Sequence, residues 1–161
     1  MVQSSQFSHI DKDGAARMVD VCAKAETERT ATVRAVVEMN ADTLAKLRAR
    51  ALPKGDVLTV AQIAGIMAAK RTSDLIPMCH PLLLTGIDVR FEIRDTPPAV
   101  IIEATVHTRG RTGVEMEALV AAQTAAATIY DMCKAVQRDI VIRDVRLVRK
   151  DGGKSGLFKA D

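Results

Sequence analysis

Aromatic side chains are scarce in this sequence of 161 residues, which contains three Phe, one Tyr and no Trp. Proteins that bind single-stranded nucleic acids usually stack bases on aromatic side chains, so this scarcity argues against such a function. The charge excess is also small, because 23 Lys and Arg oppose 20 Asp and Glu, which leaves a net charge of +3. Such an excess does not mark a nucleic-acid binder, although it suits a small anionic ligand.

Long apolar runs are missing as well. The longest uncharged stretches include 75–87 and 118–130, and both are shorter than the roughly 18 to 20 residues of a membrane-spanning helix. The first eight residues have neither the basic start nor the apolar core of a signal peptide. We therefore expect a cytoplasmic protein that has no membrane partner.

Cysteine is rare, and its spacing excludes common uses. Cys22, Cys79 and Cys133 form no C-x-x-C pair, and their odd number argues against a disulfide framework. Cys79 and His80 are adjacent, which is not the spacing of zinc ligands. We expect reduced thiols, as in a cytoplasm, and no metal site.

What the sequence does contain is a regular hydrophobic pattern. Hydrophobic residues make up 48% of the chain, and the length fits one domain over 1–161, with 1–15 and 150–161 expected to be flexible. Alternation of apolar and polar residues, or helical periodicity, predicts the elements in chain order. These are a strand at 30–39, helices at 41–50 and 57–71, strands at 87–94 and 100–107, a helix at 114–136 and a strand at 140–147.

This order predicts an α+β fold. It reads β-α-β-β-α-β with one extra short helix, which is typical of the ferredoxin-like arrangement, an antiparallel sheet with helices on one face. We expect the other face to be open, with apolar positions that another subunit would cover. On the helix at 57–71 we expect a buried stripe made of Val57, Val60, Ile63, Ala64 and Met67.

The long helix at 114–136 carries an unusual charged pair. Between 118 and 137 its only charged residues are Asp131 and Lys134, which share one face. A solvated ion pair is the commoner explanation for such a pair. The alternative is an acid/base carboxylate whose pKa is tuned by the neighbouring ammonium group. Glu117 lies 14 residues before Asp131, so about 21 Å separates them along the helix.

Three loops are further candidates for a binding site. Two prolines fix the backbone around Met78, Cys79 and His80, which fits either a structural loop or a rigid binding wall. Glycines flank Arg111 just before the long helix, where phosphate binding and simple helix capping are both consistent with the sequence. The segment 150–156 is not a P-loop, because Val148 replaces its first glycine. It is expected to be a glycine hinge whose lysines could close over phosphates.

Several segments together carry a resemblance to a known family. The chain resembles cyclic pyranopterin monophosphate synthases, the second-step enzymes of molybdenum cofactor biosynthesis, over about residues 9–158. The resemblance rests on KGDV at 54–57, AGI at 64–66, AKRT at 69–72, DLIPMCHP at 74–81, TGVEMEAL at 112–119, IYDMCKAV at 129–136 and GGKSG at 152–156.

The resemblance implies a lyase of molybdopterin biosynthesis. Its nucleotide-derived substrate would be a cyclised dihydroguanosine triphosphate, and its products cyclic pyranopterin monophosphate and diphosphate. It also implies a ferredoxin-like homohexamer, a trimer of dimers, with sites between subunits. No cofactor is implied, although magnesium could accompany the triphosphate.

The resemblance also implies roles for individual residues. Asp131 would be the principal catalytic residue, assisted by Lys54 and Lys134. The remaining site residues would contact substrate or lie beside it: Met78, Cys79, His80, Glu115, Met116, Glu117, Lys150 and Lys154. Because Glu117 and Asp131 lie far apart on one helix, we predict that each site takes them from different subunits.

Two other functions are compatible with the fold. A noncatalytic nucleotide-binding module could share it, but such a module has little need for Asp131 and Lys134 together in an apolar helix. An RNA-recognition domain has the same order of elements, but it stacks bases on aromatic residues of its central strands. The strand at 100–107 contains none, so we expect no nucleic-acid partner.

Overall fold

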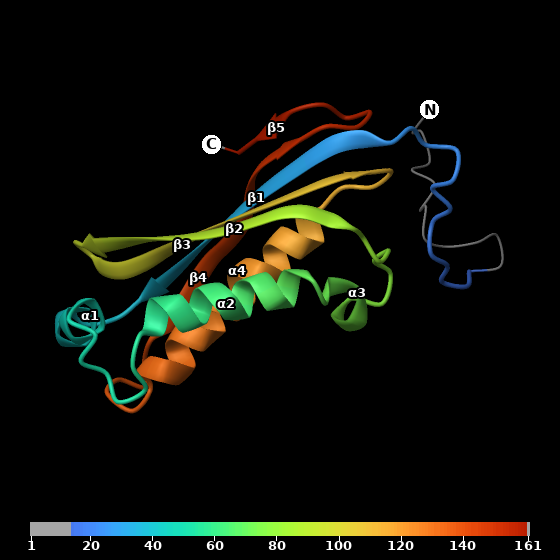
Figure 1. Ribbon diagram of the computed structural model, residues 1–161. Coiled ribbons are helices and arrows are strands. Elements are labelled where there is room, and N and C mark those ends of the chain that lie inside the picture. The colour runs from blue at the N-terminus through green and yellow to red at the C-terminus, as the bar shows by residue number, and fades with distance from the viewer. Residues whose placement is uncertain (1–13, 161) are drawn as a thin grey trace.

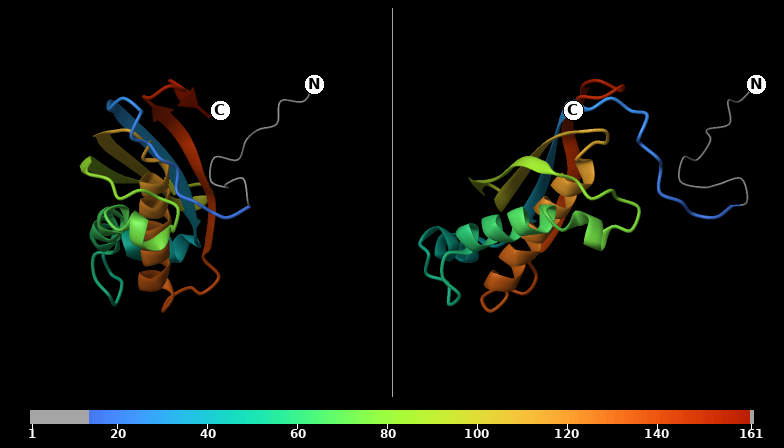
Figure 2. Two further views of the ribbon diagram at one scale, coloured as in Figure 1. Left: turned by 90° about the vertical axis from the view of Figure 1, so that its right-hand side faces the viewer. Right: turned by 45° about the vertical axis from the view of Figure 1, so that its right-hand side comes forward.

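The computed structural model describes residues 14–160, so the expected flexibility of residues 1–15 falls almost entirely outside the described part of the chain. One antiparallel sheet is covered on one face by helices (Figures 1 and 2). The strands are β1 (Thr27–Glu38), β2 (Leu84–Asp95), β3 (Pro98–Gly110), β4 (Val141–Asp151) and β5 (Phe158–Lys159), and the helices are α1 (Ala41–Arg48), α2 (Val57–Ala69), α3 (Thr72–Leu75) and α4 (Glu115–Cys133).

The strand order is β2-β3-β1-β4-β5, and all neighbouring pairs are antiparallel. The first four positions reproduce the split β-α-β arrangement, which confirms the predicted α+β, ferredoxin-like fold. The short helix α3 and the edge strand β5 are additions to the prediction. In β5, Phe158 pairs with Lys150, while the expected flexibility of 150–161 stays a prediction.

The central strand β1 forms as its alternation predicts. Ala31, Val33, Ala35 and Val37 are fully buried against the helices, because side chains two residues apart point to the same face of a strand. β1 pairs along its whole length with β3 and along most of it with β4. The core therefore lies between the sheet and the α2–α4 pair.

The predicted buried stripe of α2 is wrong apart from Val57. Val60, Ile63 and Met67 expose 43%, 53% and 49% of their surface, and Ala64 is only half-buried. The residues of α2 that the structure buries are smaller on average: Val57, Ala61, Gly65 and Ala69.

Close packing of α2 on α4 explains this reversal. A Cβ atom on Gly65 would lie 3.0 Å from the carbonyl oxygen of Ala121 and 3.4 Å from Cβ of Ala125. At this separation only small side chains fit between the helices. The larger apolar residues of α2 consequently turn outward and form an exposed stripe.

The open sheet face also differs from expectation, because its centre is polar. Across β1 and β3, Thr30 binds the His107 ring nitrogen Nδ1 at 2.9 Å, and the hydroxyls of Thr32 and Thr105 lie 3.0 Å apart. Next in the register, Arg34 and Glu103 form an ion pair at 3.5 Å. The centre of this face is therefore polar rather than apolar, and its cover by another subunit stays a prediction.

Candidate functional site

The predicted catalytic residues meet at the C-terminal end of α4. Lys54 Nζ lies 2.5 Å from Asp131 Oδ2, and Lys134 Nζ lies 2.6 Å from Oδ1 of the same carboxylate. Lys54 also donates to the Asp131 carbonyl oxygen at 3.1 Å, which satisfies an acceptor that the end of the helix leaves open. We call Lys54, Asp131 and Lys134 the aspartate half-site.

The packing of α2 against α4 brings Lys54 to this place. The two helices run antiparallel, so the start of α2 lies beside the end of α4 (Figure 1). Gly55 turns the chain with a φ of +84°, a conformation that favours glycine. Asp56 then caps α2 by accepting a hydrogen bond from the Thr59 amide.

Two ammonium groups control the protonation of Asp131. Hydrogen bonds from Lys134 and then Lys54 lower the pKa of Asp131 to about 2. The same contact raises the pKa of Lys134 above its ordinary value. At neutral pH the half-site therefore holds a carboxylate between two ammonium groups, so its protons reside on lysine nitrogens. All three side chains are about half exposed.

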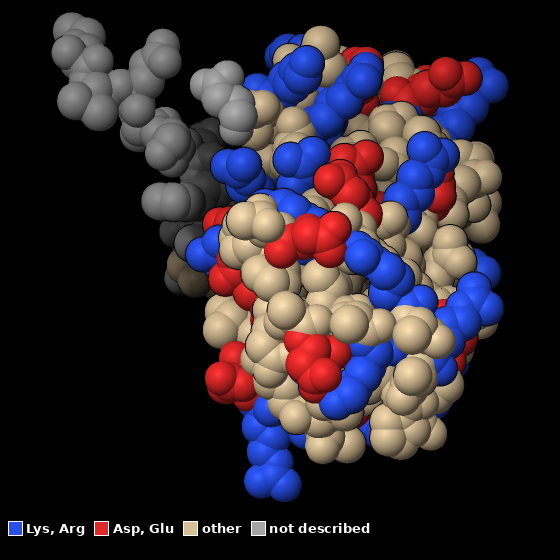
Figure 3. All heavy atoms as spheres, turned by 90° about the vertical axis from the view of Figure 1, so that its left-hand side faces the viewer, with Lys and Arg blue, Asp and Glu red and all other residues tan. Residues whose placement is uncertain are grey.

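Charged side chains of both signs are mixed on the face of the molecule where α1 lies. Figure 3 views the molecule from the side where α1 lies, and Lys and Arg side chains there alternate with Asp and Glu side chains. The ion pairs Arg48–Asp95 and Lys46–Asp42 belong to the same pattern. No broad surface of one sign covers this face, which agrees with the small net charge.

A second group of predicted residues lies at the other end of α4, around a cavity of about 370 Å³. Its walls include Met78, Cys79 and His80 from the loop after α3, and Met116 and Glu117 from the first turn of α4. We call these five residues the glutamate half-site. The rigid loop thus forms the wall of a cavity, which is one of the two possibilities left open by its prolines.

His80 also makes the structural contact that was the other possibility. Its Nε2 donates a hydrogen bond to the carbonyl oxygen of Val19 at 2.8 Å, because a carbonyl can only accept. In the neutral ring Nδ1 is then the acceptor. The contact fixes the orientation of the imidazole ring.

Glu117 is the buried carboxyl of this half-site, with only 4% of its surface exposed. Burial is the main cause that raises the pKa of Glu117, and the nearby Glu115 adds to it. Burial and the charge of Glu117 likewise raise the pKa of the Cys79 thiol. Burial in the glutamate half-site therefore shifts both groups toward their protonated forms, whereas the lysines of the aspartate half-site favour the ionised carboxylate.

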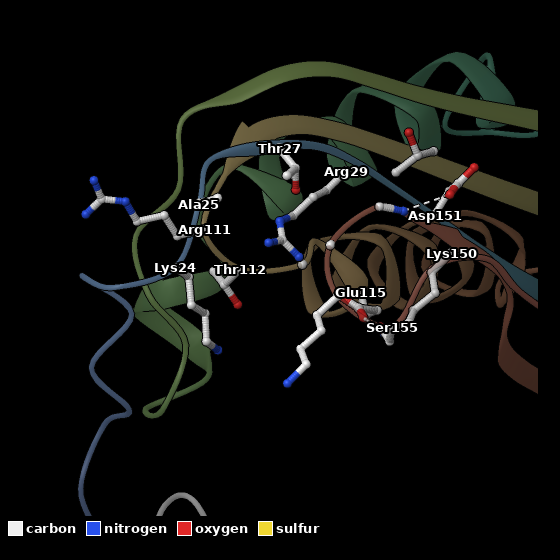
Figure 4. Close-up of a pocket in the computed structure, with 15 residues that line it drawn as sticks. Lys24, Ala25, Thr27, Arg29, Arg111, Thr112, Glu115, Lys150, Asp151 and Ser155 are labelled. Carbon is white, nitrogen blue, oxygen red and sulfur yellow. Dashed lines mark hydrogen bonds and ion pairs between the residues drawn. The ribbon is translucent and has the colours of Figure 1, made fainter.

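A larger cavity of about 800 Å³ adjoins the glutamate half-site (Figure 4). Both cavities are lined by Lys24, Thr112, Gly113 and Glu115. The two predicted lysines of the C-terminal segment, Lys150 and Lys154, belong to the larger one, and Lys150 binds Glu115 at 2.9 Å. We call this larger space the cationic cavity.

The sequence analysis missed two of the five cations of the cationic cavity, Lys24 and Arg29. A signal for Arg29 was present, because it continues the inward-facing alternation of Ala31 and Val33 toward the start of β1. A charged residue in that register marks the point where the inner face of the sheet opens to solvent. Lys24 precedes the strand, and its spacing gives no such signal.

The structure does not bring the two half-sites together within one chain. Glu117 and Asp131 belong to the first and last turns of α4, about 21 Å apart by helix geometry. Neither the cavity of the glutamate half-site nor the cationic cavity includes Asp131, Lys54 or Lys134. Among the residues described, no His, Cys, Asp and Glu side chains cluster so as to hold a metal ion.

Comparison with known proteins fixes the family. The model of the MoaC family matches residues 18–153, which is most of the chain. This chain belongs to the MoaC family. The match includes both half-sites and ends one residue before Lys154.

Relatives of this MoaC-family chain carry a consistent name. It is 70% identical over 161 residues, all of both chains, to the cyclic pyranopterin monophosphate synthase of Nitratidesulfovibrio vulgaris. It is 64% identical over 157 residues to the synthase of Oleidesulfovibrio alaskensis, covering 98% of this chain and 99% of the relative. The synthase of a Roseiflexus species is 57% identical over the same share of each chain. No described helix is long and apolar enough to cross a membrane.

Proposed function

We propose that this MoaC-family chain is a cyclic pyranopterin monophosphate synthase. It converts a cyclised dihydroguanosine triphosphate into cyclic pyranopterin monophosphate and diphosphate. The observation that carries the proposal is the full-length identity of 70% to a synthase. The geometry supports it, because the fold combines proton-transferring groups with a cationic cavity large enough for part of a nucleoside triphosphate.

The two half-sites suit the chemistry of this rearrangement. Opening a purine-derived ring and closing a pyran ring require several proton transfers, for which donors and acceptors of different pKa are needed. In our proposal Lys54 and Lys134 donate protons, while the ionised Asp131 orients both ammonium groups. Glu117 supplies a carboxyl whose pKa is raised by burial, so it holds its proton to a higher pH than an exposed glutamate does.

We also propose that a complete site forms between two copies of the chain. The exposed stripe of Val60, Ile63 and Met67 on α2 supports this, because it lies between the two half-sites. Lys54 precedes α2, and Met78 follows α2 after the short helix α3. A two-fold axis across the stripe makes the two α2 helices antiparallel, and places the aspartate half-site of one copy beside the glutamate half-site of the other. Each pair would then hold two sites, and three pairs would form a hexamer.

The proposed reaction uses no resident cofactor. Magnesium would enter with the triphosphate, and turnover measured in chelator and after magnesium is added back tests this point. We further propose a cytoplasmic location, because three cysteines at separate places in the fold suit a reducing compartment.

Turnover of the authentic substrate tests the proposed function. The purified protein is incubated with the cyclised dihydroguanosine triphosphate, and released diphosphate and oxidised pterin product are measured. Asp131→Asn should abolish most of the turnover. Asp42→Asn is a matched control, because Asp42 forms an equally short ion pair of 2.6 Å with Lys46 on α1. Binding without turnover by the parent would instead favour a noncatalytic nucleotide-binding module.

A further inference from the structure

Lys134 lies at the point where α4 ends, and the helix alone does not fix its side chain. It is the C-terminal cap residue of α4, and its side chain is 51% exposed, yet its ammonium group lies 2.6 Å from the Asp131 carboxylate. Helix ends fray, and the lysine side chain is a flexible four-carbon stem. Because an ion pair between exposed groups is weak by itself, the position of Lys134 depends on what holds the chain around it.

Tyr130 holds both ends of the turn that follows α4. Its carbonyl oxygen accepts a hydrogen bond from the Lys134 amide at 2.8 Å. Its hydroxyl donates a hydrogen bond to the Arg138 carbonyl oxygen at 3.1 Å. The segment 134–138 is therefore bound by one residue at its first and last positions. The hydroxyl contact spans eight residues, so it fixes the path of the chain beyond the last turn of the helix.

The ring of Tyr130 is itself held in place. It is partly buried and packs against the hydrophobic core between the sheet and the helices. The turn has one more anchor, because Gln137 Oε1 accepts a hydrogen bond from the amide of Asn40, the N-terminal cap residue of α1, at 2.8 Å. The core and α1 together give the turn a fixed position relative to the sheet.

Helix geometry places Lys134 between Tyr130 and Asp131. Lys134 comes four residues after Tyr130 and three after Asp131, so its side chain lies between theirs on the helix surface. The ring on one side narrows the directions that the lysine stem can take, and the carboxylate lies on the other side. Asp131 is the main cause that raises the pKa of Lys134, and Tyr130 adds a smaller contribution, which agrees with this closeness.

We propose that Tyr130 is a positioning residue of the synthase, which keeps the Lys134 ammonium group on Asp131. This inference rests on the proposed function, in which Lys134 donates a proton. The Tyr130 hydroxyl has one proton, and its bond to the Arg138 carbonyl oxygen uses it, so Tyr130 acts through Lys134. Without the hydroxyl, the turn loses the contact at its far end and Lys134 spends more time away from Asp131.

Competitive labelling of lysine amines tests this inference without any substrate. A trace of acetic anhydride labels each lysine according to how readily its ammonium group gives up its proton, and mass spectrometry measures the label at single residues. Lys46 is the internal reference, because its ion pair with Asp42 is equally short at 2.6 Å. In Tyr130→Phe the label at Lys134 relative to Lys46 should rise about twofold to tenfold, the range for the loss of one hydrogen bond.

Thr128→Val is the matched control for Tyr130→Phe. Thr128 belongs to the same helix, is partly buried like Tyr130 and donates to a backbone carbonyl oxygen, that of Thr124, at 2.8 Å. Its hydrogen bond stays within α4 and does not reach the turn, so its labelling ratio should equal that of the parent. An unchanged ratio in folded Tyr130→Phe, or an equal rise in Thr128→Val, would overturn the inference.

A fluorine measurement keeps the inference testable if Tyr130→Phe does not fold. Tyr130 is the only tyrosine of the sequence, so replacing tyrosine by 3-fluorotyrosine gives a single fluorine NMR signal from its ring. Lys134→Gln should shift this signal, because the lysine stem lies beside the ring, whereas Lys46→Gln should leave it unchanged. A signal that stays at the parent position in Lys134→Gln would count decisively against the inference.

Turnover separates this inference from the proposed function. The kcat of Tyr130→Phe should fall by about twofold to tenfold at unchanged KM, because Lys134 donates a proton rather than binds the substrate. If the parent is active and Tyr130→Phe keeps its kcat, the inference is wrong and the synthase assignment stands. If the labelling ratio rises in Tyr130→Phe but the parent shows no turnover, the synthase assignment fails, and Tyr130 still positions Lys134.

Discussion

Mixing two inactive variants should restore activity if each site takes Asp131 from one copy and Glu117 from another. Asp131→Asn and Glu117→Gln each damage every site of a homo-oligomer, so each variant alone should be inactive. When equal amounts assemble at random, a given site has an intact aspartate half-site with a probability of one half. It has an intact glutamate half-site with the same probability. The mixture should therefore regain about a quarter of the parent turnover.

The assay measures diphosphate release after the two variants are co-expressed, or unfolded together and refolded. The expectation rests on the separation of about 21 Å between Glu117 and Asp131 along α4, because one small substrate cannot contact both residues of a single chain. A mixture of Asp131→Asn with Lys54→Ala is the control, because both changes damage the same half-site and no combination of chains is intact. Turnover that stays at the level of the separate variants, while refolded parent is active, would refute the composite site.

Packing, burial and the exposed stripe each lead to a further prediction. Gly65→Ala should lower the free energy of unfolding by about 1 kcal/mol. Crowding against Ala121 costs about 1–3 kcal/mol, and the better helix propensity of alanine offsets about 1 kcal/mol of that cost. An unchanged urea midpoint would contradict the close packing. The parent should lose stability as pH rises above 4.5, the ordinary pKa of Glu117. The reason is that Glu117 holds its proton more tightly in the native state than in the unfolded chain. Urea unfolding measured across pH should show no such loss for Glu117→Gln. Ile63→Glu should reduce both the mass measured by light scattering and the turnover, with an unchanged circular dichroism spectrum, and an intact assembly would count against the stripe as an interface.

The strands could be predicted because their evidence lies in the local sequence. Alternation of Ala31, Val33 and their neighbours determines which face of β1 is buried, whatever partner packs on it. The stripe of α2 could not be predicted in the same way. Apolar residues surround that helix on most sides, and the distance to α4 decides which of them is buried; at Gly65 an added Cβ would lie only 3.0 Å from the carbonyl oxygen of Ala121.

The site shows the same division between local and distant evidence. The resemblance named Lys54 and Asp131, but their contact depends on the antiparallel packing of α2 and α4, which joins residues 77 positions apart. The sequence also suggested that Glu117 and Asp131 are far apart, because both belong to one regular helix. Arg29 was missed because the strand was predicted to begin at residue 30, and the observed β1 begins three residues earlier, at Thr27.

The length of α2 sets the separation between the two half-sites of one chain. The helix has 13 residues and separates the segment of Lys54 from the segment of Met78. Removing one residue would shorten this separation by about 1.5 Å and rotate one segment by about 100° against the other. In a two-fold pair the same error would appear in both sites at once. Insertions and deletions in the evolution of such proteins should therefore collect in the connection between β2 and β3 or after β4, and should spare α2 and α4.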